Sequence, residues 1–434
     1  MNKYSQFNSI ISLSPKFDLL YNAYSDRFVI LTKALSETLA NIDVEKMEKN
    51  YSNFYEKLLK AGCIIDKDTN EVENVKKIQE KVDNSSESFN LIINPTLNCN
   101  FKCWYCYESH VPKSKINEQT FLNIKLFILN VISKQEGLKH FSLGFFGGEP
   151  LLHYKQVKEI ISYTNDICSQ YNITLFVAFT TNGYLINKEM IRDFRSSNVK
   201  NLQITLDGNR NQHDKVRYSG RQGSFDKIIQ NINLLLENQI GITLRINYTT
   251  ENISGIKDIL QDIHFWSEKQ KTHLDIQFHR VWQDSKLDIN DEVDKTIDCF
   301  LKHGFKAYKF PLDNVKKPCY ADTSYGALIN YNGDVYRCTA LNFAKTQREG
   351  FLNNQGRIVW ENESNETRKN AKFKNKSCLT CRILPVCNGG CSQKAIEYKD
   401  SDYCIFRFNE DDKNKAILDK LKFYLTCSPD FKFS

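Results

Sequence analysis

The sequence lacks both a membrane-spanning segment and a secretion signal. None of its 434 residues belong to an apolar run of about 18 or more, which excludes a transmembrane helix. The first 30 residues are interrupted by the charged side chains Lys3, Lys16, Asp18, Asp26 and Arg27. These charges leave no room for the apolar core of a signal peptide. We therefore expect a cytoplasmic protein without a membrane partner.

A long block of one charge is also missing, as are internal repeats and low-complexity tracts. The chain has 59 Lys and Arg against 52 Asp and Glu, a net charge of +7 that is spread along its length. A weak basic balance without a Lys/Arg run argues against nucleic-acid binding. Apolar residues make up 41% of the chain, enough for real cores. The length suggests two or three domains of about 150 residues each.

Cysteine, in contrast, is abundant and unevenly distributed. Four of the 14 cysteines stand alone in the chain, namely Cys63, Cys168, Cys299 and Cys427, and the other ten form two groups. A chain without a secretion signal is not expected to keep disulfides. Grouped cysteines in such a chain indicate metal or iron–sulfur ligands. The four isolated cysteines are expected to be small buried apolar side chains.

Strand and helix patterns divide the chain into four parts. Residues 1–82 predict a small α+β domain, with strand material at 21–31 and helices at 51–59 and 72–82, followed by a polar linker at 83–88. Strand patterns at 89–93, 141–146, 174–180, 201–206, 242–248 and 273–278 alternate with helical patterns such as 121–132 and 157–161. This alternation predicts a parallel sheet over 89–300, and six units suit an open, partial (β/α)6 barrel with functional residues at the strand ends. Residues 310–408 are turn-rich and cysteine-rich, and 409–434 predict a C-terminal helix and tail.

The first cysteine group follows the first predicted barrel strand. It reads Cys99-x3-Cys103-x2-Cys106 within NPTLNCNFKCWYCY. Three thiolates can hold three irons of a four-iron cubane, which leaves the fourth iron open to a chelating small molecule. A structural zinc site is the competing interpretation, but zinc prefers four closed ligands, usually in C-x2-C pairs. The spacing therefore favours an iron–sulfur site.

Further motifs end the second, third and fourth predicted strands. They read Phe146-Gly147-Gly148-Glu149-Pro150, Thr181-Asn182-Gly183 and Thr205-Leu206-Asp207-Gly208, the last followed by His213-Asp214-Lys215-Val216-Arg217. Together with the cysteines, these motifs resemble the radical S-adenosylmethionine (radical SAM) superfamily. Glycine lets a ligand approach the backbone closely, and arginine is suited to a carboxylate. The resemblance implies that S-adenosylmethionine is bound by Tyr105, Gly147, Gly148, Glu149, Asn182, Thr205, Arg217 and Val281.

This resemblance also implies a reaction. The cluster would pass one electron to the bound sulfonium, giving methionine and a 5′-deoxyadenosyl radical that removes a hydrogen atom from the substrate. The protein would position the reactants and exclude water, because the difficult chemistry belongs to the cofactor. An electron donor such as a flavodoxin or ferredoxin would be a partner.

The second cysteine group reads Cys319-x13-Gly333-x4-Cys338, then Cys378-x2-Cys381-x5-Cys387-x3-Cys391, and finally Cys404. Seven cysteines exceed one metal site, and a pair of zinc ions would want eight ligands. The pattern resembles the SPASM domain, which implies two auxiliary [4Fe–4S] clusters and three clusters in total. By position, Cys319, Cys338 and Cys391 would hold the first, and Cys378, Cys381, Cys387 and Cys404 the second. Asp313 stands where some members have a further cysteine, so the first has three matched ligands, with Cys299 a weaker candidate for the fourth.

The substrate is predicted from the first domain. Residues 1–82 resemble the precursor-peptide recognition domains of peptide-modifying enzymes, although the same pattern would suit a capping domain. We therefore predict a maturase that forms a thioether or carbon–carbon cross-link in a ribosomally made peptide. The alternatives are a peptide epimerase or oxidase and a sulfatase-maturing enzyme that makes formylglycine, whose family has Asp where this chain has Thr339. A non-catalytic adaptor would not explain the glycine motif and Arg217. No catalytic base is assigned, and His153, His279 and Arg280 near strand ends are expected to be structural unless they lie in the barrel mouth.

Overall fold

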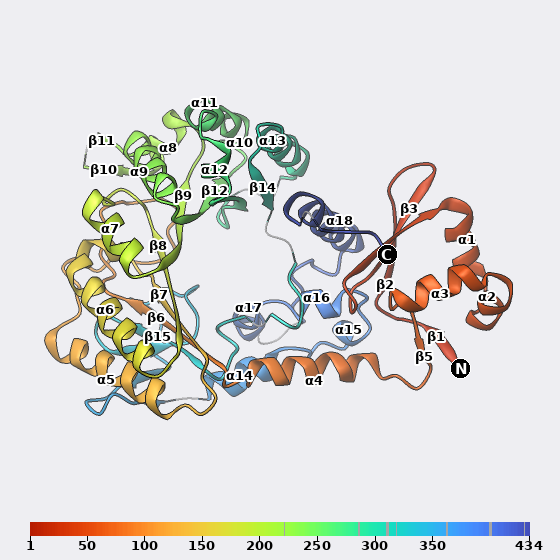
Figure 1. The fold of residues 1–434 in the computed structure, drawn as a ribbon, viewed down its shortest axis with the longest axis horizontal. Coiled ribbons are helices and arrows are strands. Elements are labelled where there is room, and N and C mark those ends of the chain that lie inside the picture. The colour runs from red at the N-terminus through yellow and green to blue at the C-terminus, as the bar shows by residue number, and fades with distance from the viewer. Residues whose placement is uncertain are drawn as a thin grey trace. The chain divides into compact units, whose positions relative to one another are not determined.

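The computed structural model describes residues 1–220, 222–284, 287–309, 312–317, 319–361, 363–398, 402–428 and 430–434, without the side chains of 364 and 365. The chain forms two compact units, each assembled from separate stretches (Figure 1). The barrel unit comprises Ser85–Phe310 and Tyr325–Ser364. The terminal unit comprises Met1–Asn84, Pro311–Ser324 and Asn365–Ser434. The domain boundaries that the sequence suggests stay a prediction.

The barrel unit contains the six predicted strands in a parallel arrangement. They are β6 (Ser88–Asn94), β7 (His140–Phe145), β8 (Thr174–Thr181), β9 (Val199–Leu206), β12 (Gly241–Tyr248) and β13 (Leu274–Arg280). The main connecting helices are α5 (Glu118–Lys134), α6 (Tyr154–Gln170), α7 (Lys188–Ser196) and α9 (Phe225–Glu237), which cover one side of the strands (Figure 1). The predicted α/β architecture, an open parallel sheet with helical crossovers, is confirmed.

The sheet is larger than the sequence predicts. Strand β14 (Lys306–Lys309) pairs in parallel with β13, and β15 (Gly326–Asn330) pairs in parallel with β6. Three antiparallel strands, β16 (Asp334–Tyr336), β17 (Gly350–Leu352) and β18 (Ile358–Trp360), extend it further. These strands have only three to five residues each. Such short segments carry too little alternation to be recognised in a turn-rich sequence.

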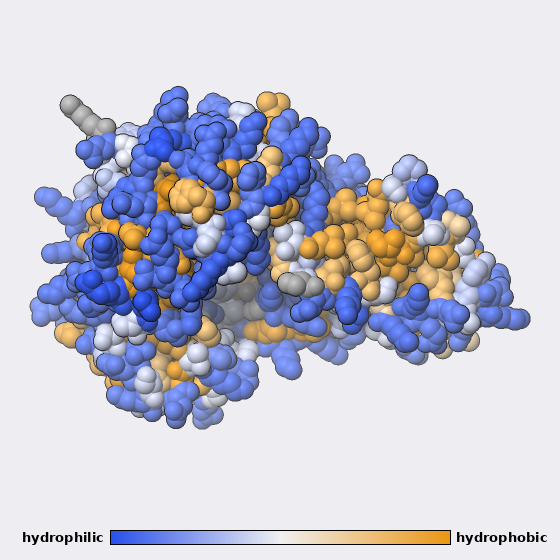
Figure 2. Space-filling model, turned by 45° about the horizontal axis from the view of Figure 1, so that its top comes forward, coloured by the Kyte–Doolittle hydropathy of each residue, from blue (hydrophilic) through white to orange (hydrophobic). Residues whose placement is uncertain are grey.

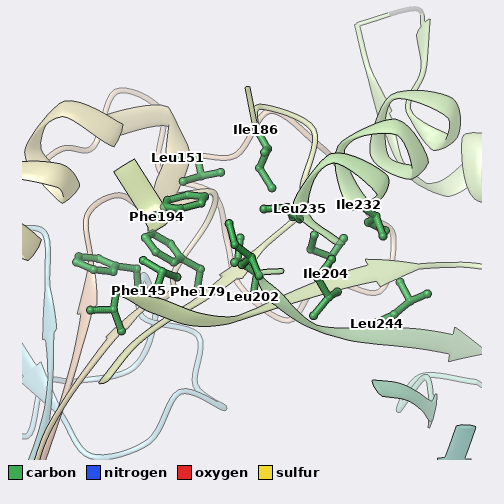
Figure 3. Close-up of a cluster of buried hydrophobic side chains, with 14 of the residues drawn as sticks. Phe145, Leu151, Phe179, Ile186, Phe194, Leu202, Ile204, Ile232, Leu235 and Leu244 are labelled. Carbon is green, nitrogen blue, oxygen red and sulfur yellow. The ribbon is translucent and has the colours of Figure 1, made fainter. Parts of the chain in front are cut away.

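The two faces of the barrel sheet differ in polarity. In β12, Leu244 and Ile246 are buried in the main hydrophobic core, where strand residues such as Ile204 meet Ile232 and Leu235 of helix α9 (Figure 3). Because side chains alternate along a strand, the intervening residues point to the opposite face. On β9, β12 and β13 these are polar, namely Gln203, Thr205, Thr243, Arg245, Asn247, Gln277 and His279. We call this the polar face of the barrel sheet.

The terminal unit contains a three-stranded antiparallel sheet of β2 (Asn8–Ser12), β3 (Phe17–Asn22) and β4 (Arg27–Thr32). Residues 21–31, expected as strand material, form a hairpin whose turn includes Asp26 in the left-handed region (φ 57°). The Asn22 side chain accepts hydrogen bonds from the backbone N–H groups of Tyr24 and Ser25, which stabilises this turn. Helices α1 (Lys33–Asn41), α2 (Val44–Asn50) and α3 (Ser52–Lys60) cover one sheet face. A short ladder joins β1 (Asn2–Tyr4) to β5 (Ile64–Asp66).

The other face of this sheet packs against segments from the far end of the chain. Tyr21 and Phe28 share a core with Val75 of α4 (Glu71–Asp83), Leu384 of α16 (Leu384–Cys387) and Ile417 of α18 (Glu410–Cys427). The N-terminal strands and the later cysteine-rich segment are therefore one folding unit, held by shared apolar burial.

Among the described helices, none combines the length and the apolar character that a membrane span needs.

Candidate active site

The first cysteine group lies on the loop between β6 and α5. Cys99 and Cys103 are partly buried and Cys106 is exposed. The loop is fixed by Thr96, whose hydroxyl donates to the carbonyl of Ser114 (2.6 Å) and whose own carbonyl accepts from the N–H of Gly148 (3.1 Å). The N–H of Glu149 in turn donates to the carbonyl of Asn98 (2.9 Å). The turn after β7 is therefore hydrogen-bonded to the cysteine loop.

Two glycines make this close packing possible. A Cβ atom at Gly147, which has φ 97°, would lie 2.5 Å from the Thr96 carbonyl oxygen. A Cβ atom at Gly148 would lie 2.2 Å from the Asn98 carbonyl oxygen. Because both obstacles are backbone atoms of the cysteine loop, no larger residue fits without moving that loop. The glycine motif thus has a structural reason here besides its predicted contact with a ligand.

Glu149 joins the ends of β7 and β8. Its side chain is fully buried and accepts from the Thr181 hydroxyl (2.8 Å) and the Asn182 N–H (2.7 Å). Burial raises the pKa of this carboxyl, although the hydrogen bonds it accepts oppose the shift. The Asn182 amide donates to the Asn100 side-chain oxygen (2.8 Å), and its nitrogen lies 3.9 Å from the Cys99 sulfur. The structure therefore brings Glu149 and Asn182 to the cysteine loop.

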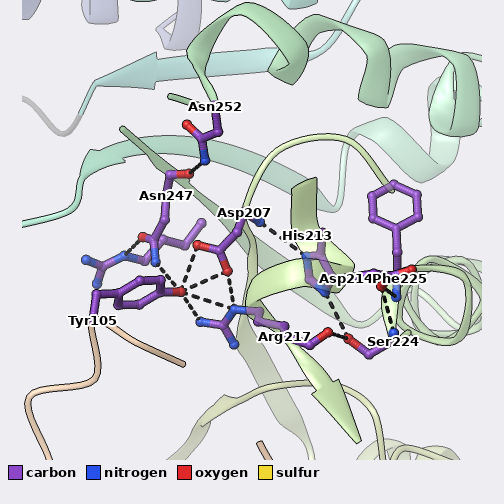
Figure 4. Close-up of polar contacts among 10 residues, drawn as sticks. Tyr105, Asp207, His213, Asp214, Arg217, Ser224, Phe225, Asn247 and Asn252 are labelled. Carbon is purple, nitrogen blue, oxygen red and sulfur yellow. Dashed lines mark hydrogen bonds and ion pairs between the residues drawn. The ribbon is translucent and has the colours of Figure 1, made fainter. Parts of the chain in front are cut away.

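A second cluster surrounds the phenol of Tyr105 (Figure 4). The hydroxyl donates to Asp207 at the end of β9 (2.7 Å) and accepts from Arg217 (2.7 Å) and Asn247 (3.0 Å). Arg217 also forms an ion pair with Asp207, and the two side chains are only 11% and 2% exposed. Arg217, predicted to contact the cofactor, is thus already paired with a carboxylate. The cluster ties the cysteine loop to β9 and β12.

His213 supports this cluster from helix α8 (Arg210–Val216). Its Nδ1 accepts from the backbone N–H of Asp207 (3.2 Å), and its Nε2 lies 3.0 Å from the Ser224 hydroxyl (Figure 4). Burial lowers the pKa of His213 well below its ordinary value, so the ring is neutral and can accept at Nδ1. His213 therefore orients the residue that holds Arg217.

The remaining predicted cofactor residues lie nearby on the same strands. Thr205 is buried on β9, in register with Arg245 of β12. Val281 is buried just after β13, and its N–H donates to the carbonyl of Tyr248 (3.0 Å). The amide of Gln283 donates to the backbone carbonyl of Tyr105 (2.8 Å). Gln283 carries no motif that the sequence could have singled out.

The second cysteine group is divided between the two units. Cys378, Cys381, Cys387 and Cys404 belong to the terminal unit, as do Cys319 and Cys391, whereas Cys338 is a buried residue of the barrel unit. Burial raises the pKa of Cys387 to about 12, and the nearby thiols of Cys381, Cys378 and Cys404 add to this shift. The last four predicted ligands therefore lie close enough to influence one another electrostatically.

Cys319 and Cys391 are linked through their neighbours. The hydroxyl of Ser392 donates to the carboxylate of Asp322 (2.5 Å), and the N–H of Asp322 donates to the carbonyl of Cys319 (2.9 Å). Within the described residues, no group of three or more Cys, His, Asp or Glu side chains is already arranged as ligands around one point. The ligand sets stay a prediction.

The isolated cysteines and basic residues are placed as follows. Cys63 and Cys168 are buried in hydrophobic cores, as predicted, and Cys299 on α13 (Asn290–Lys302) packs against the barrel core. Cys427 ends helix α18.

His153 ends a short 3-10 helix, Pro150–His153, and Arg280 pairs with Asp284 (3.0 Å). His279 lies on the polar face, where burial lowers its pKa to about 3.

Comparisons with known proteins agree with this architecture. Residues 93–263 match the family model described as the Radical SAM superfamily. The cysteine-type anaerobic sulfatase-maturating enzyme of Clostridium novyi (strain NT) is 25% identical over 343 residues, which cover 70% of this chain and 88% of that one. Fe-coproporphyrin III synthase of Methanosarcina barkeri (strain Fusaro / DSM 804) is 24% identical over 344 residues, covering 69% and 82%.

Two solved structures share the fold. Streptococcus suis SuiB bound to the precursor peptide SuiA has a TM-score of 0.54 at 17% identity and covers 93% of this chain and 98% of that one. Native anSMEcpe with bound AdoMet has a TM-score of 0.54 at 19% identity and covers 78% and 97%. At such identities the likeness concerns the fold alone.

Proposed function

Since this chain is a radical SAM enzyme, we propose that it modifies a ribosomally made precursor peptide by forming a thioether or carbon–carbon cross-link. Its family implies a [4Fe–4S] cluster and S-adenosylmethionine. When bound, this pair supplies the radical that removes a hydrogen atom from the substrate. The residues of the chain bind and orient the reactants and exclude water.

The surroundings of the cysteine loop fit such a cofactor pair. The amide oxygen and nitrogen of Asn94, at the end of β6, are buried without a hydrogen-bond partner among the described residues, and so is the amide nitrogen of Asn100. Unsatisfied buried polar atoms are rare in folded proteins and mark places where a ligand or water belongs. We assign the cluster to Cys99, Cys103 and Cys106. The cofactor would lie against Gly147, Gly148, Glu149, Asn182, Thr205, Arg217, Val281 and the backbone of Tyr105.

The second cysteine group would hold further clusters. We assign one to Cys378, Cys381, Cys387 and Cys404, which is supported by the mutual influence of their thiols. Cys319 and Cys391, which also belong to the terminal unit, are proposed ligands of another. Three cubanes would give about twelve irons per chain. A flavodoxin or ferredoxin is the proposed electron donor.

The observation that carries the choice of a peptide substrate is the outer edge of β4. Among the described strands, β4 pairs with β3 alone, so one row of its N–H and C=O groups can pair with an extended backbone. A stretch of this chain already uses that edge, because the N–H of Ser434 donates to the carbonyl of Phe28 (2.9 Å). The Phe431 ring meets the Phe28 ring edge-on at 5.8 Å.

The surface beside this edge suits an apolar peptide. Apolar side chains gather on the face of the terminal unit seen in Figure 2. Of the exposed ones, Ile30 lies on β4 and Phe17 on the adjoining β3, whereas Ile10 lies on β2 at the opposite edge of the sheet. The similarity to peptide-bound SuiB covers 93% of this chain, which adds support from the fold.

Co-expression with a short peptide encoded beside the gene tests the proposal. We expect the peptide to lose two hydrogen atoms for each link, and an unchanged mass would contradict cross-linking. Ile30→Pro provides a sharper test. Ile30 lies two residues from Phe28, so its N–H points to the same outer edge and makes no bond to β3. Ile30→Pro should weaken peptide binding, whereas Ile30→Ala, which keeps the N–H, should weaken it much less.

Formylglycine formation is the second candidate, favoured by the 25% identity to the sulfatase-maturating enzyme. Thr339 occupies the position where that family has an acidic residue. Its backbone carbonyl accepts from the hydroxyl of Tyr107 (3.1 Å). A cysteine-containing sulfatase peptide offered to the reconstituted enzyme distinguishes the two, because only a sulfatase-maturing enzyme converts its cysteine to an aldehyde.

A further inference from the structure

Arg245 stands out among the residues of the polar face. Its neighbours Leu244 and Ile246 are buried in the core, so the Arg245 side chain points to the opposite face of β12. The strand register places it between Thr205 of β9 and Gln277 of β13. It therefore lies on the same strands as the proposed cofactor residues.

Arg245 forms no ion pair with any described residue. Its Nε donates to the side-chain oxygen of Asn247 (2.9 Å), a neutral acceptor. Among the described residues, no carboxylate comes within ion-pair distance of its guanidinium, and its two terminal nitrogens make no hydrogen bond. Arg217, by contrast, pairs with Asp207, and Arg280 pairs with Asp284.

The surroundings make this unpaired charge costly. Burial lowers the pKa of the Arg245 guanidinium, and the charge of Arg217 adds to this shift, which Tyr105, Tyr107 and the carboxylate of Asp207 oppose only in part. His279, on the neighbouring strand, is held neutral by burial and by Arg245 itself. A partly buried cation without an anionic partner is destabilising, and a bound anion would recover much of that loss.

We propose that Arg245 binds a carboxylate on the polar face of the barrel sheet. A carboxylate suits this group because its two oxygens can accept from the two free terminal nitrogens in a fork. Two sources present this chemistry, the methionine moiety of S-adenosylmethionine and an acidic residue of the peptide. The second source rests on the proposed function, and the experiment distinguishes the two.

The first arm measures cofactor binding to the anaerobically reconstituted enzyme by calorimetry. S-adenosylmethionine is compared with decarboxylated S-adenosylmethionine, which lacks only the carboxylate, on wild type, Arg245→Gln and Arg245→Lys. If the cofactor supplies the carboxylate, Arg245→Gln weakens the binding of S-adenosylmethionine by about tenfold or more and leaves the affinity for the decarboxylated analogue unchanged. Arg245→Lys recovers part of the loss because it keeps the charge without the fork.

The second arm measures the binding of a capped Gly-Glu-Gly peptide and of its Gly-Gln-Gly counterpart at saturating S-adenosylmethionine. If the peptide supplies the carboxylate, wild type prefers the Glu peptide by about tenfold, and Arg245→Gln removes this preference while cofactor affinity is unchanged. Arg280→Gln is the matched control, because Arg280 already pairs with Asp284. Equal affinities of wild type and Arg245→Gln in both arms, with the variant folded, would overturn the proposal. Cross-linking activity in that case would leave the proposed function intact.

Discussion

The buried cation Lys372 offers the most quantitative prediction about the terminal unit. Its ammonium lies 2.8 Å from Asp322 and 3.7 Å from Asp83, and all three side chains are at most 2% exposed. Gln79 donates to Asp83 (3.0 Å), and Ser392 donates to Asp322 (2.5 Å). Asp83 ends α4, so this network joins the N-terminal helices to the segments that carry Cys319 and Cys391.

Lys372→Met would leave two buried carboxylates without their cation. Removing one partner of a buried ion pair typically costs about 3–5 kcal/mol, because the remaining charge stays buried. Burial already raises the pKa of Asp83, and Lys372 opposes that shift. Without Lys372 the Asp83 carboxyl takes up a proton more readily. The destabilisation should therefore be largest at alkaline pH and shrink as the pH falls.

Anaerobic urea unfolding of the cluster-free chain measures this loss. All four tryptophans, Trp104, Trp266, Trp282 and Trp360, belong to the barrel unit. Tryptophan fluorescence therefore follows the barrel unit, and circular dichroism follows both units. We expect Lys372→Met to move the circular-dichroism transition to lower urea while the fluorescence transition stays in place.

A control and a second variant make the test decisive. Lys394→Met removes a half-exposed lysine of the same unit that pairs with Glu397, and it should cost no more than about 1 kcal/mol. Adding Asp83→Asn and Asp322→Asn to Lys372→Met should restore much of the stability. A loss below about 1 kcal/mol for Lys372→Met would refute the reasoning from buried charge.

Three further predictions follow from particular contacts. Burial lowers the pKa of His279 to about 3 in the folded chain. At a pH below the ordinary pKa of histidine, the unfolded chain therefore binds a proton that the folded chain does not. The free energy of unfolding should then decrease as the pH is lowered. Between pH 7.5 and 5.5 this costs about 1.4 kcal/mol, and the fall should vanish in His279→Gln in the same urea assay. Gly148→Ala would push the Asn98 carbonyl aside and should remove about four irons per chain, whereas Gly144→Ala, whose added Cβ would lie 3.4 Å or more from its neighbours, should keep them. Removal of residues 430–434 should tighten peptide binding in a fluorescence titration by freeing the β4 edge, and unchanged affinity would speak against that docking edge.

The sequence was most informative where chemistry and backbone geometry coincide. The six long parallel strands were predictable because each has an alternating or apolar pattern between helical segments. The glycine motif was recognisable for the same reason, since Gly147 and Gly148 are required by the approach of two backbones. Short strands such as β14 and β15 were missed because they lack enough residues for a period.

Long-range partners could not be predicted from one sequence. Nothing in the spacing indicates that Tyr105 meets Asp207 and Asn247, that Gln283 reaches the Tyr105 carbonyl, or that Lys372 lies between Asp83 and Asp322. Polar side chains of this kind have no periodic pattern, and their partners are decided by tertiary packing. The shared core of the N-terminal strands and helix α18 has the same origin.

Electron paramagnetic resonance of the reduced enzyme with and without S-adenosylmethionine, together with iron content, tests whether the cysteine loop holds a cluster with one open iron. We expect S-adenosylmethionine to change the signal of the wild-type enzyme, because one iron of the cluster held by Cys99, Cys103 and Cys106 would be open to it. Replacing these three cysteines by alanine should remove that response and about four of about twelve irons, while the remaining clusters persist. A wild-type signal that S-adenosylmethionine leaves unchanged, or a triple variant that still cleaves S-adenosylmethionine, would contradict an open iron on this loop.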